Sequence, residues 1–327
     1  MRLNSLSGRP QPIWPALAAC LSLPGAACPA VSAPVRDQAE TRRFDLETSD
    51  GVSLATWYYE PSEDAAPLAT VILVHDFEGS HKSVEPLALA LREAGCTVAV
   101  PDLRGHGASK AQEGHDADLE IRQLRKSDLE LIAAGAGGRL REQSAVRGDL
   151  ETVHRFLASR GAAGGSAEAP LVVIGCGAGA TLAALWTAAD WAWPPLASGP
   201  QGQEVKALVL VSPAWAAKGL TIQPALGTDA IRREIPLLVL VGKADRDGIR
   251  LFEQLKQKRP REWFDQRADK EFTKAKEVEK PDDATLFLVQ FDTTLSGEKL
   301  AAEADTAPRI KTFLELVLGD DSRPRSR

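Results

Sequence analysis

Six apolar runs rich in valine, isoleucine and leucine constrain the fold of this chain more than any other feature. They lie within residues 69–76, 96–109, 171–186, 205–215, 235–245 and 284–292. Continuous apolar runs of this kind are typical of parallel strands that are buried on both faces. Segments with helical spacing, such as 83–95 and 306–318, alternate with them. The sequence therefore predicts an α/β fold with a mostly parallel central sheet and helices on both faces.

The length and composition favour one large domain. The chain has 327 residues and a net charge of −6 from 39 basic and 45 acidic residues. Because no basic stripe stands out, the sequence argues against a nucleic-acid partner. No linker or internal repeat interrupts the pattern, so we expect a single α/β domain over residues 34–320. We expect the tail, residues 321–327, to be disordered.

The first 33 residues differ from the rest of the chain. Arg2 and Arg9 carry the only charges there, and the apolar stretch IWPALAACLSLPGAA precedes small residues that end at Ala33. This order is typical of an export signal, so we expect a periplasmic or extracellular protein, with a disordered start as the alternative. The stretch LAAC also fits a bacterial lipobox, which would put a lipid anchor on Cys20. The apolar stretch is too short and too rich in proline for a transmembrane span.

Cleavage near Ala33 would leave Cys96 and Cys176 as the cysteines of the mature chain. One precedes an expected strand and the other follows one, so they should lie at opposite edges of a parallel sheet. We therefore predict no disulfide. Two separate cysteines also make no metal site, and the sequence predicts no cofactor.

The stretch LVVIGCGAGATLAALW, residues 171–186, has two interpretations. Residues 175–180 read G-x-G-x-x-A, the pattern of a dinucleotide-binding loop. Such a site also needs an acidic residue at the end of the next strand to bind the ribose. Asp190 has about the right spacing, but it lies within TAADWAWPPLASG rather than at a strand end. Nucleotide binding at 175–180 is therefore the weaker interpretation.

Residues 175–179 also fit the frame G-x-Ser-x-G of a hydrolase nucleophile elbow, with glycine in place of the nucleophile. Upstream, His75-Asp76 forms a turn after a strand, and Asp102 to Ser109 reads D-x-R-G-x-G-x-S. In combination, residues 40–318 resemble the α/β-hydrolase superfamily. The block DWAWPPLASGPQGQEVKALVLVSP also looks like a group of uncharacterised, exported bacterial hydrolase-like proteins with a degenerate elbow.

The resemblance implies a triad of nucleophile, acid and base in that order along the chain. The nucleophile position is Gly177, which has no reactive side chain, and the acid position is Asp245. The base position follows the last strand and falls on Ser296, where family members often carry histidine. No histidine lies after residue 154, so none can complete the order. Removing the nucleophile or the base from such a unit costs on the order of a millionfold in turnover.

The resemblance also implies an oxyanion hole at the rim of a pocket. Its donors would be the backbone N–H groups of Ala178 and Phe77, the latter in the turn that contains His75 and Asp76. Because these donors do not depend on the triad, binding can persist without chemistry.

Three hypotheses about function result. The first is a catalytically inactive α/β-hydrolase-fold protein, without a large cap domain, that is retained as a binding or interaction module for an unidentified small molecule or protein. The second is an esterase or thioesterase in which Cys176 is a relocated nucleophile, because a helix N-terminus lowers the pKa of a thiol. The third is nucleotide binding at 175–180.

Overall fold

The sheet contains nine strands, and most of them are parallel. A computed structural model describes residues 41–61, 65–133, 147–162, 169–193, 202–267, 272, 274, 278, 280 and 282–319. The strands of the sheet are β1 (Arg42–Glu47), β2 (Ser53–Tyr59), β3 (Ala69–Val74), β4 (Cys96–Pro101), β5 (Leu171–Cys176), β6 (Val205–Val211), β9 (Leu237–Gly242), β10 (Trp263–Arg267) and β11 (Leu286–Phe291). Their order is β1-β2-β4-β3-β5-β6-β9-β11-β10. In this sheet the pairs β1–β2 and β2–β4 are antiparallel and the other pairs of described strands are parallel, which confirms the predicted sheet.

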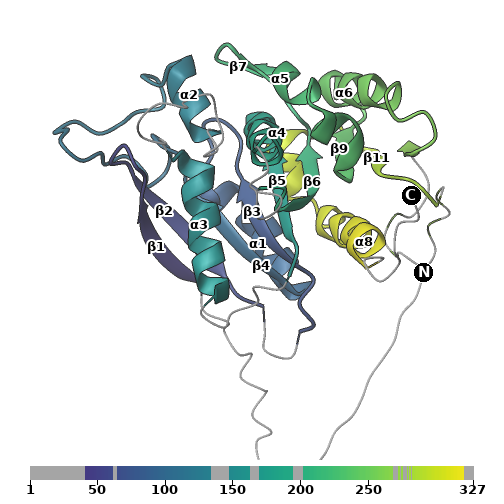
Figure 1. Cartoon of the computed structure of the whole chain (residues 1–327), viewed down its shortest axis with the longest axis horizontal. Helices are drawn as coiled ribbons and strands as arrows, with labels where there is room; N and C mark the ends of the chain where they lie inside the picture. Colours follow the sequence, from purple (N-terminus) through teal and green to yellow (C-terminus); the bar gives the residue numbers. More distant parts are fainter. Residues whose placement is uncertain are drawn as a thin grey trace, which may run out of the picture. The chain divides into compact units, whose positions relative to one another are not determined.

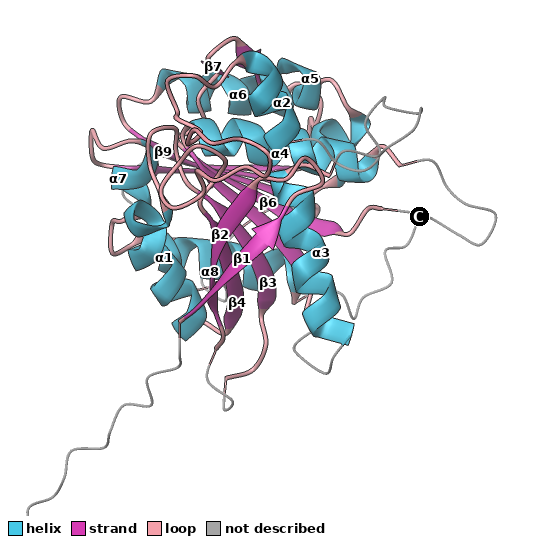
Figure 2. Ribbon diagram, turned by 90° about the vertical axis from the view of Figure 1, so that its left-hand side faces the viewer, coloured by secondary structure: helices cyan, strands magenta, loops and turns pink. Residues whose placement is uncertain are grey.

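Helices cover both faces of this sheet (Figures 1 and 2). They are α1 (His81–Glu93), α2 (Lys126–Ile132), α3 (Asp149–Ala162), α4 (Ala178–Trp191), α5 (Gln223–Leu226), the π-helix η1 (Ala230–Glu234), α6 (Arg246–Lys256), α7 (Gly297–Ala301) and α8 (Thr306–Leu318). Side chains of α1, α7 and α8 join one hydrophobic core. Side chains of α2 to α6 and η1 join the other. The predicted arrangement of helices on two faces is confirmed.

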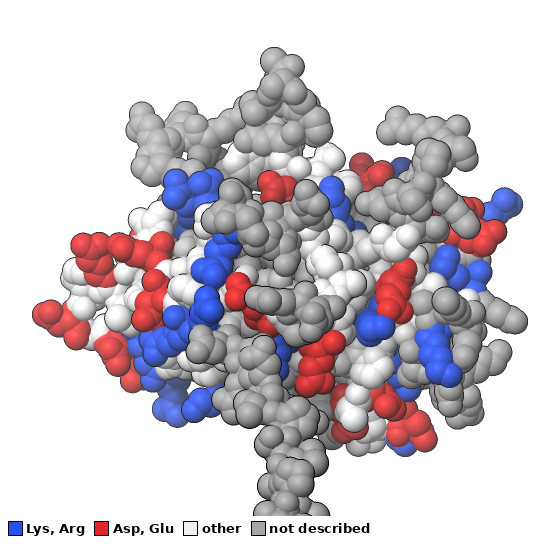
Figure 3. Space-filling model, turned by 90° about the horizontal axis from the view of Figure 1, so that it is seen from below, with Lys and Arg blue, Asp and Glu red and all other residues white. Residues whose placement is uncertain are grey.

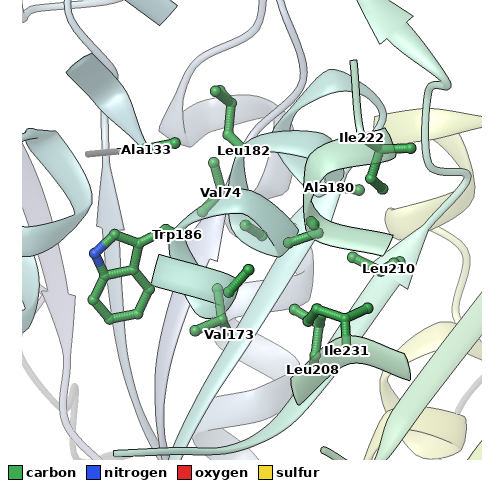
Figure 4. Close-up of a cluster of buried hydrophobic side chains, with 14 of the residues drawn as sticks. Val74, Ala133, Val173, Ala180, Leu182, Trp186, Leu208, Leu210, Ile222 and Ile231 are labelled. Atoms are coloured by element: carbon green, nitrogen blue, oxygen red, sulfur yellow. The ribbon is translucent and has the colours of Figure 1, made fainter. Parts of the chain in front are cut away.

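Two hydrophobic cores follow from the strand sequences, because successive strand residues point to opposite faces. Along β5, Val173 belongs to one core, while Val172 and Ile174 belong to the other. Figure 4 shows the core that contains Val173, with Trp186 of α4 in the same cluster. Parallel strands buried on both faces require this continuous apolar pattern.

The edge strand β10 is the main element that the sequence did not predict. Helix α6 continues to Lys256, within the charged segment 253–283. Beyond α6, β10 pairs in parallel with β11. Its polar pattern WFDQR is tolerated because an edge strand pairs on one side only.

The chain between β6 and β9 carries short elements rather than a large cap. It contains the two-residue strands β7 (Ala216–Ala217) and β8 (Leu220–Thr221), followed by α5 and η1. The predicted export signal over residues 1–33, the lipobox cysteine Cys20 and the tail 321–327 lie outside the described residues. Within the described residues, no helix has both the length and the apolarity needed to cross a bilayer.

Candidate functional site

The carboxyl ends of five neighbouring parallel strands converge on one pocket of about 420 Å³. The residues that line it follow β3, β5, β6, β9 and β11: Asp76, Gly177, Ala178, Ser212, Pro213, Ala214, Ala244, Asp245, Arg246, Asp247, Thr294, Ser296 and Gly297. The chain leaves β3 for β4 on one side, and β5 lies on the other side. Ligand sites of open α/β sheets form at such a reversal of strand order.

Gly177 is the turn between β5 and α4, and it has φ +57°. Gly175 and Gly179 leave room for a close crossing of backbones. A Cβ on Gly175 would collide with the backbone of Ala180, and one on Gly179 would collide with the carbonyl oxygen of His75. These two glycines therefore let the strand and the helix approach each other as closely as a nucleophile elbow requires.

This geometry argues against nucleotide binding at 175–180. The acidic residue that would bind a ribose, Asp190, is buried on α4. Its Oδ2 accepts hydrogen bonds from the backbone N–H groups of Glu204 and Val205, at 2.9 and 3.1 Å. Asp190 thus holds the start of β6, and its carboxylate is not available to a ligand.

The carboxylate of Asp76 occupies the predicted oxyanion hole. Its Oδ1 accepts hydrogen bonds from the backbone N–H groups of Phe77 and Ala178, both at 2.7 Å. The two predicted donors are therefore brought together, but both already bind an anion supplied by the chain itself. Hydrogen bonds from N–H groups to a carboxylate are among the stronger ones in proteins.

Asp76 also takes the space of a nucleophile side chain. A Cβ built on Gly177 would overlap the Asp76 carboxylate. Gly297, which has φ +56°, lies on the other side, and a Cβ there would come within 2.7 Å of Asp76 Oδ2. Ser296, the predicted base position, and Gly177, the predicted nucleophile position, both line this pocket.

Asp245 follows β9 and caps helix α6. Its Oδ1 accepts a hydrogen bond from the Gly248 N–H at 2.9 Å. Burial raises the pKa of this carboxyl group. The Ser212 side chain lies against this carboxylate and partly offsets the effect of burial. The predicted acid position is therefore a helix cap packed against Ser212.

The structure places Cys176, the alternative nucleophile, away from the pocket. Cys176 is fully buried at the end of β5 and belongs to the core beneath α1 and α8. It is not among the residues that line the pocket. Burial, together with the nearby carboxylates of Glu298 and Asp76, raises the pKa of its thiol well above the usual value. The side chain of a strand residue one position before the turn points into the core, so it cannot replace residue 177.

His75 shapes the turn rather than the pocket. It is fully buried and is not among the lining residues. Its Nδ1 lies 2.7 Å from the Asp76 carbonyl oxygen, and its Nε2 accepts a hydrogen bond from the Leu103 N–H at 3.1 Å. Burial lowers the pKa of His75 to about 4. Of the four residues predicted at the oxyanion hole, only Asp76 and Ala178 line the pocket, and Phe77 contributes its N–H.

Two residues of the site were missed by sequence reasoning. Glu298 accepts a hydrogen bond from the Asp76 N–H through Oε1, at 2.8 Å. Burial, with a contribution from the charge of Asp76, raises the pKa of Glu298. Ser212 lies directly after β6 with φ +46°, a strained conformation for a residue with a side chain. No sequence pattern marks either residue; only the position of Ser212 after a buried strand could have indicated it.

The described residues contain no cluster of three or more histidine, cysteine, aspartate or glutamate side chains that could hold a metal ion.

Comparison with known proteins agrees with this fold. The model of the alpha/beta hydrolase family matches residues 71–325. The solved structure of a Pyrococcus furiosus esterase is similar with a TM-score of 0.53 and 15% identity, over 86% of this chain and 92% of that one. The structure of a putative dienelactone hydrolase from Klebsiella pneumoniae is similar with a TM-score of 0.50 and 16% identity, over 85% of this chain and 97% of that one. No curated protein matches. From residue 71 onward, this chain thus belongs to the α/β-hydrolase family.

Proposed function

We propose that this protein is an α/β-hydrolase without serine-hydrolase activity, and that its pocket is retained for binding. The observation that carries the proposal is the position of Asp76, whose Oδ1 accepts both N–H groups of the oxyanion hole. An ester oxygen that develops negative charge would have to displace a carboxylate that already holds both donors. In addition, Gly177 has no side chain that could act as a nucleophile.

A relocated nucleophile has no support at the pocket. Cys176 is buried in the core beneath α1 and α8, and burial raises the pKa of its thiol. The hydroxyls of Ser212 and Ser296 lie in the pocket lining, but none of the five histidines does. A serine hydroxyl is a weak nucleophile unless an adjacent base accepts its proton.

The proposal includes export. It rests on the sequence of the first 33 residues, with Arg2 and Arg9, the apolar stretch and the small residues up to Ala33. Mass spectrometry of the protein taken from the cells that make it tests this. We expect either a chain that begins near residue 34 or one that begins at a lipid-modified Cys20. A chain that retains residues 1–33 in the cytoplasm contradicts export.

Hydrolysis of a panel of acyl esters, from acetyl to octanoyl, tests the central proposal. We expect the purified protein to show no turnover above buffer. Turnover that copurifies with the protein and disappears in Asp76→Asn would instead make this carboxylate part of an active site. Turnover that disappears in Cys176→Ala would restore the cysteine hypothesis. Either result overturns the proposal.

A further inference from the structure

Strand β1 forms an exposed edge of the sheet. It is the first strand in the sheet order, and within the described residues it pairs with β2 alone. Four of its six residues are exposed and none is buried, whereas β4, two strands further in, is buried throughout. In Figure 2, β1 faces the viewer between α1 and α3. The outer side of β1 is therefore open to a further strand.

The pairing with β2 determines which backbone groups of β1 point outward. The Thr48 N–H donates to the Val52 carbonyl oxygen at 3.0 Å, which extends the register of the two strands by one residue pair. Along an antiparallel strand, hydrogen-bonded pairs alternate with pairs that are not hydrogen-bonded. Phe44, four residues before Thr48, thus bonds to β2. The N–H and C=O groups of Arg43 and Asp45 point away from β2.

The side chains at these two outward-facing positions have opposite charges. Arg43 and Asp45 lie on the same face of β1, because they are two residues apart. Their side chains are 48% and 55% exposed, and Nη2 of Arg43 lies 2.7 Å from Oδ1 of Asp45. A second copy of β1, running antiparallel, could therefore place each charge opposite the other sign.

The outward backbone groups and the charges together select one register. A two-fold axis at Phe44 brings Arg43 of each copy opposite Asp45 of the other, so that both pairs exchange backbone hydrogen bonds and carry opposite charges. An axis at Arg43 or at Asp45 would instead put two like charges directly opposite each other. The axis at Phe44 also makes the two Phe44 rings neighbours on the other face, where each ring is only partly buried.

We infer that β1 pairs with β1 of a second copy of this chain, antiparallel about Phe44, and that the protein forms a two-fold dimer through this edge. The inference goes beyond the proposed function and does not depend on it. Proteins protect exposed edges against such pairing with charged side chains, proline or bulges. The charges of β1 disfavour the registers that oppose like charges, but they favour this one. The contact is closed, because both copies use the same strand.

The contact is small, so we expect a transient dimer rather than a permanent one. Interfaces that bury less than about 1,200 Å² are typical of weak complexes. Acidic and basic side chains are interspersed on the face seen in Figure 3, so that face carries no field of one sign that would attract or repel a second copy. The charge dependence of association should therefore come from Arg43 and Asp45.

Sedimentation velocity of the full chain measures the association. We expect the sedimentation coefficient to rise from the monomer value toward the dimer value between about 5 and 500 µM, as for other small interfaces. Hydrogen exchange then locates the contact, because the outward amides of Arg43 and Asp45 should exchange more slowly in the dimer. A protein that remains monomeric over this whole range overturns the inference.

Two charge variants test the register. Arg43→Asp carries two acidic side chains on this face of β1, and Asp45→Arg carries two basic ones. Each variant alone should associate about tenfold more weakly than the parent protein, because both cross-strand pairs become repulsive. An equal mixture of the two should dimerise again, since every acidic residue then lies opposite a basic one. Both variants lose the ion pair within the strand, so that loss cannot explain a recovery in the mixture.

The controls separate this register from a general effect of charge. The double variant Arg43→Asp with Asp45→Arg exchanges the two charges, and we expect it to dimerise like the parent protein. Lys243→Asp makes the same reversal at another exposed ion pair, with Asp292, and should leave association unchanged. Equal weakening by Lys243→Asp and Arg43→Asp overturns the inference. So does a mixture of the two β1 variants that stays monomeric.

Discussion

Gly177 and Asp76 share one small space. The Asp76 carboxylate lies where a side chain at position 177 would begin, and its Oδ1 is held by the N–H groups of Phe77 and Ala178. The lack of a side chain at position 177 and the position of the Asp76 carboxylate are therefore linked by packing. A nucleophile cannot return at 177 while Asp76 keeps this conformation.

Gly177→Ser should therefore destabilise the protein without creating an esterase. We expect a loss of about 1–3 kcal/mol, because the new Cβ displaces the carboxylate and φ is positive. Asp76→Gly in the same chain should recover part of the loss, since it removes the overlap but not the backbone strain. Urea unfolding of the two single variants and the double variant measures the coupling. Strictly additive effects would mean that the two residues do not compete for this space.

His75 predicts a loss of stability in acid. Its pKa falls from 6.5 to about 4 on folding because of burial. Between these two pKa values the unfolded chain binds a proton at His75 that the folded protein does not bind. The contribution of His75 to the free energy of unfolding is therefore complete above about pH 6.5 and is lost as the pH falls toward 4. The full effect is about 3 kcal/mol. Urea unfolding between pH 7 and 4 should show a shallower decline for His75→Gln than for the parent protein.

The matched control for His75 is His115→Gln, which changes an exposed histidine. We expect its decline to follow that of the parent protein. Identical slopes for all three proteins would show that His75 is not the group that couples folding to pH in this range.

At the scale of elements, the sequence was sufficient where local pattern and burial agree. The predicted final helix, residues 306–318, matches α8, and each apolar run became a strand, because burial on both faces requires that pattern. The sequence also placed Ser296 and Gly177 at one pocket through the family's order. It could not reveal that Asp76 accepts the Ala178 N–H, or that Glu298 accepts the Asp76 N–H, because these contacts join distant segments. β10 was missed because an edge strand needs no apolar pattern.

The crossing of β5 and α4 gives a prediction about packing. A Cβ on Gly179 would collide with the carbonyl oxygens of His75 and Val74. Gly179→Ala should therefore cost about 1–3 kcal/mol, although alanine is the better helix former. Gly227→Ala is the control, since its Cβ would come no closer than 3.3 Å to Pro224 and the site is exposed. Thermal unfolding should show a lower Tm for the first variant and almost no change for the second; equal Tm values would contradict tight packing at the elbow.

At the scale of the whole molecule, Arg104 joins three parts of the chain. It lies after β4 and donates to Asp50, in the turn between β1 and β2, at 2.7 Å. It also donates to Asp149, at the start of α3, through Nε at 2.9 Å and Nη2 at 2.6 Å. Arg104 and Asp149 are buried, so their charges depend on each other. This network links the turn between β1 and β2, at the antiparallel edge of the sheet, to the start of α3.

Arg104→Met should destabilise the protein by about 3–5 kcal/mol, because it leaves the buried Asp149 carboxylate without a countercharge. Arg43→Met is the matched control. Arg43 pairs with Asp45, but both side chains are about half exposed, and exposed ion pairs contribute about 0–1 kcal/mol. Urea unfolding measures both changes. Similar small losses would mean that the strands and helices hold the antiparallel edge without the ion pairs, whereas a large loss for Arg104→Met alone would identify this network as the fastening between the edge hairpin and the parallel sheet.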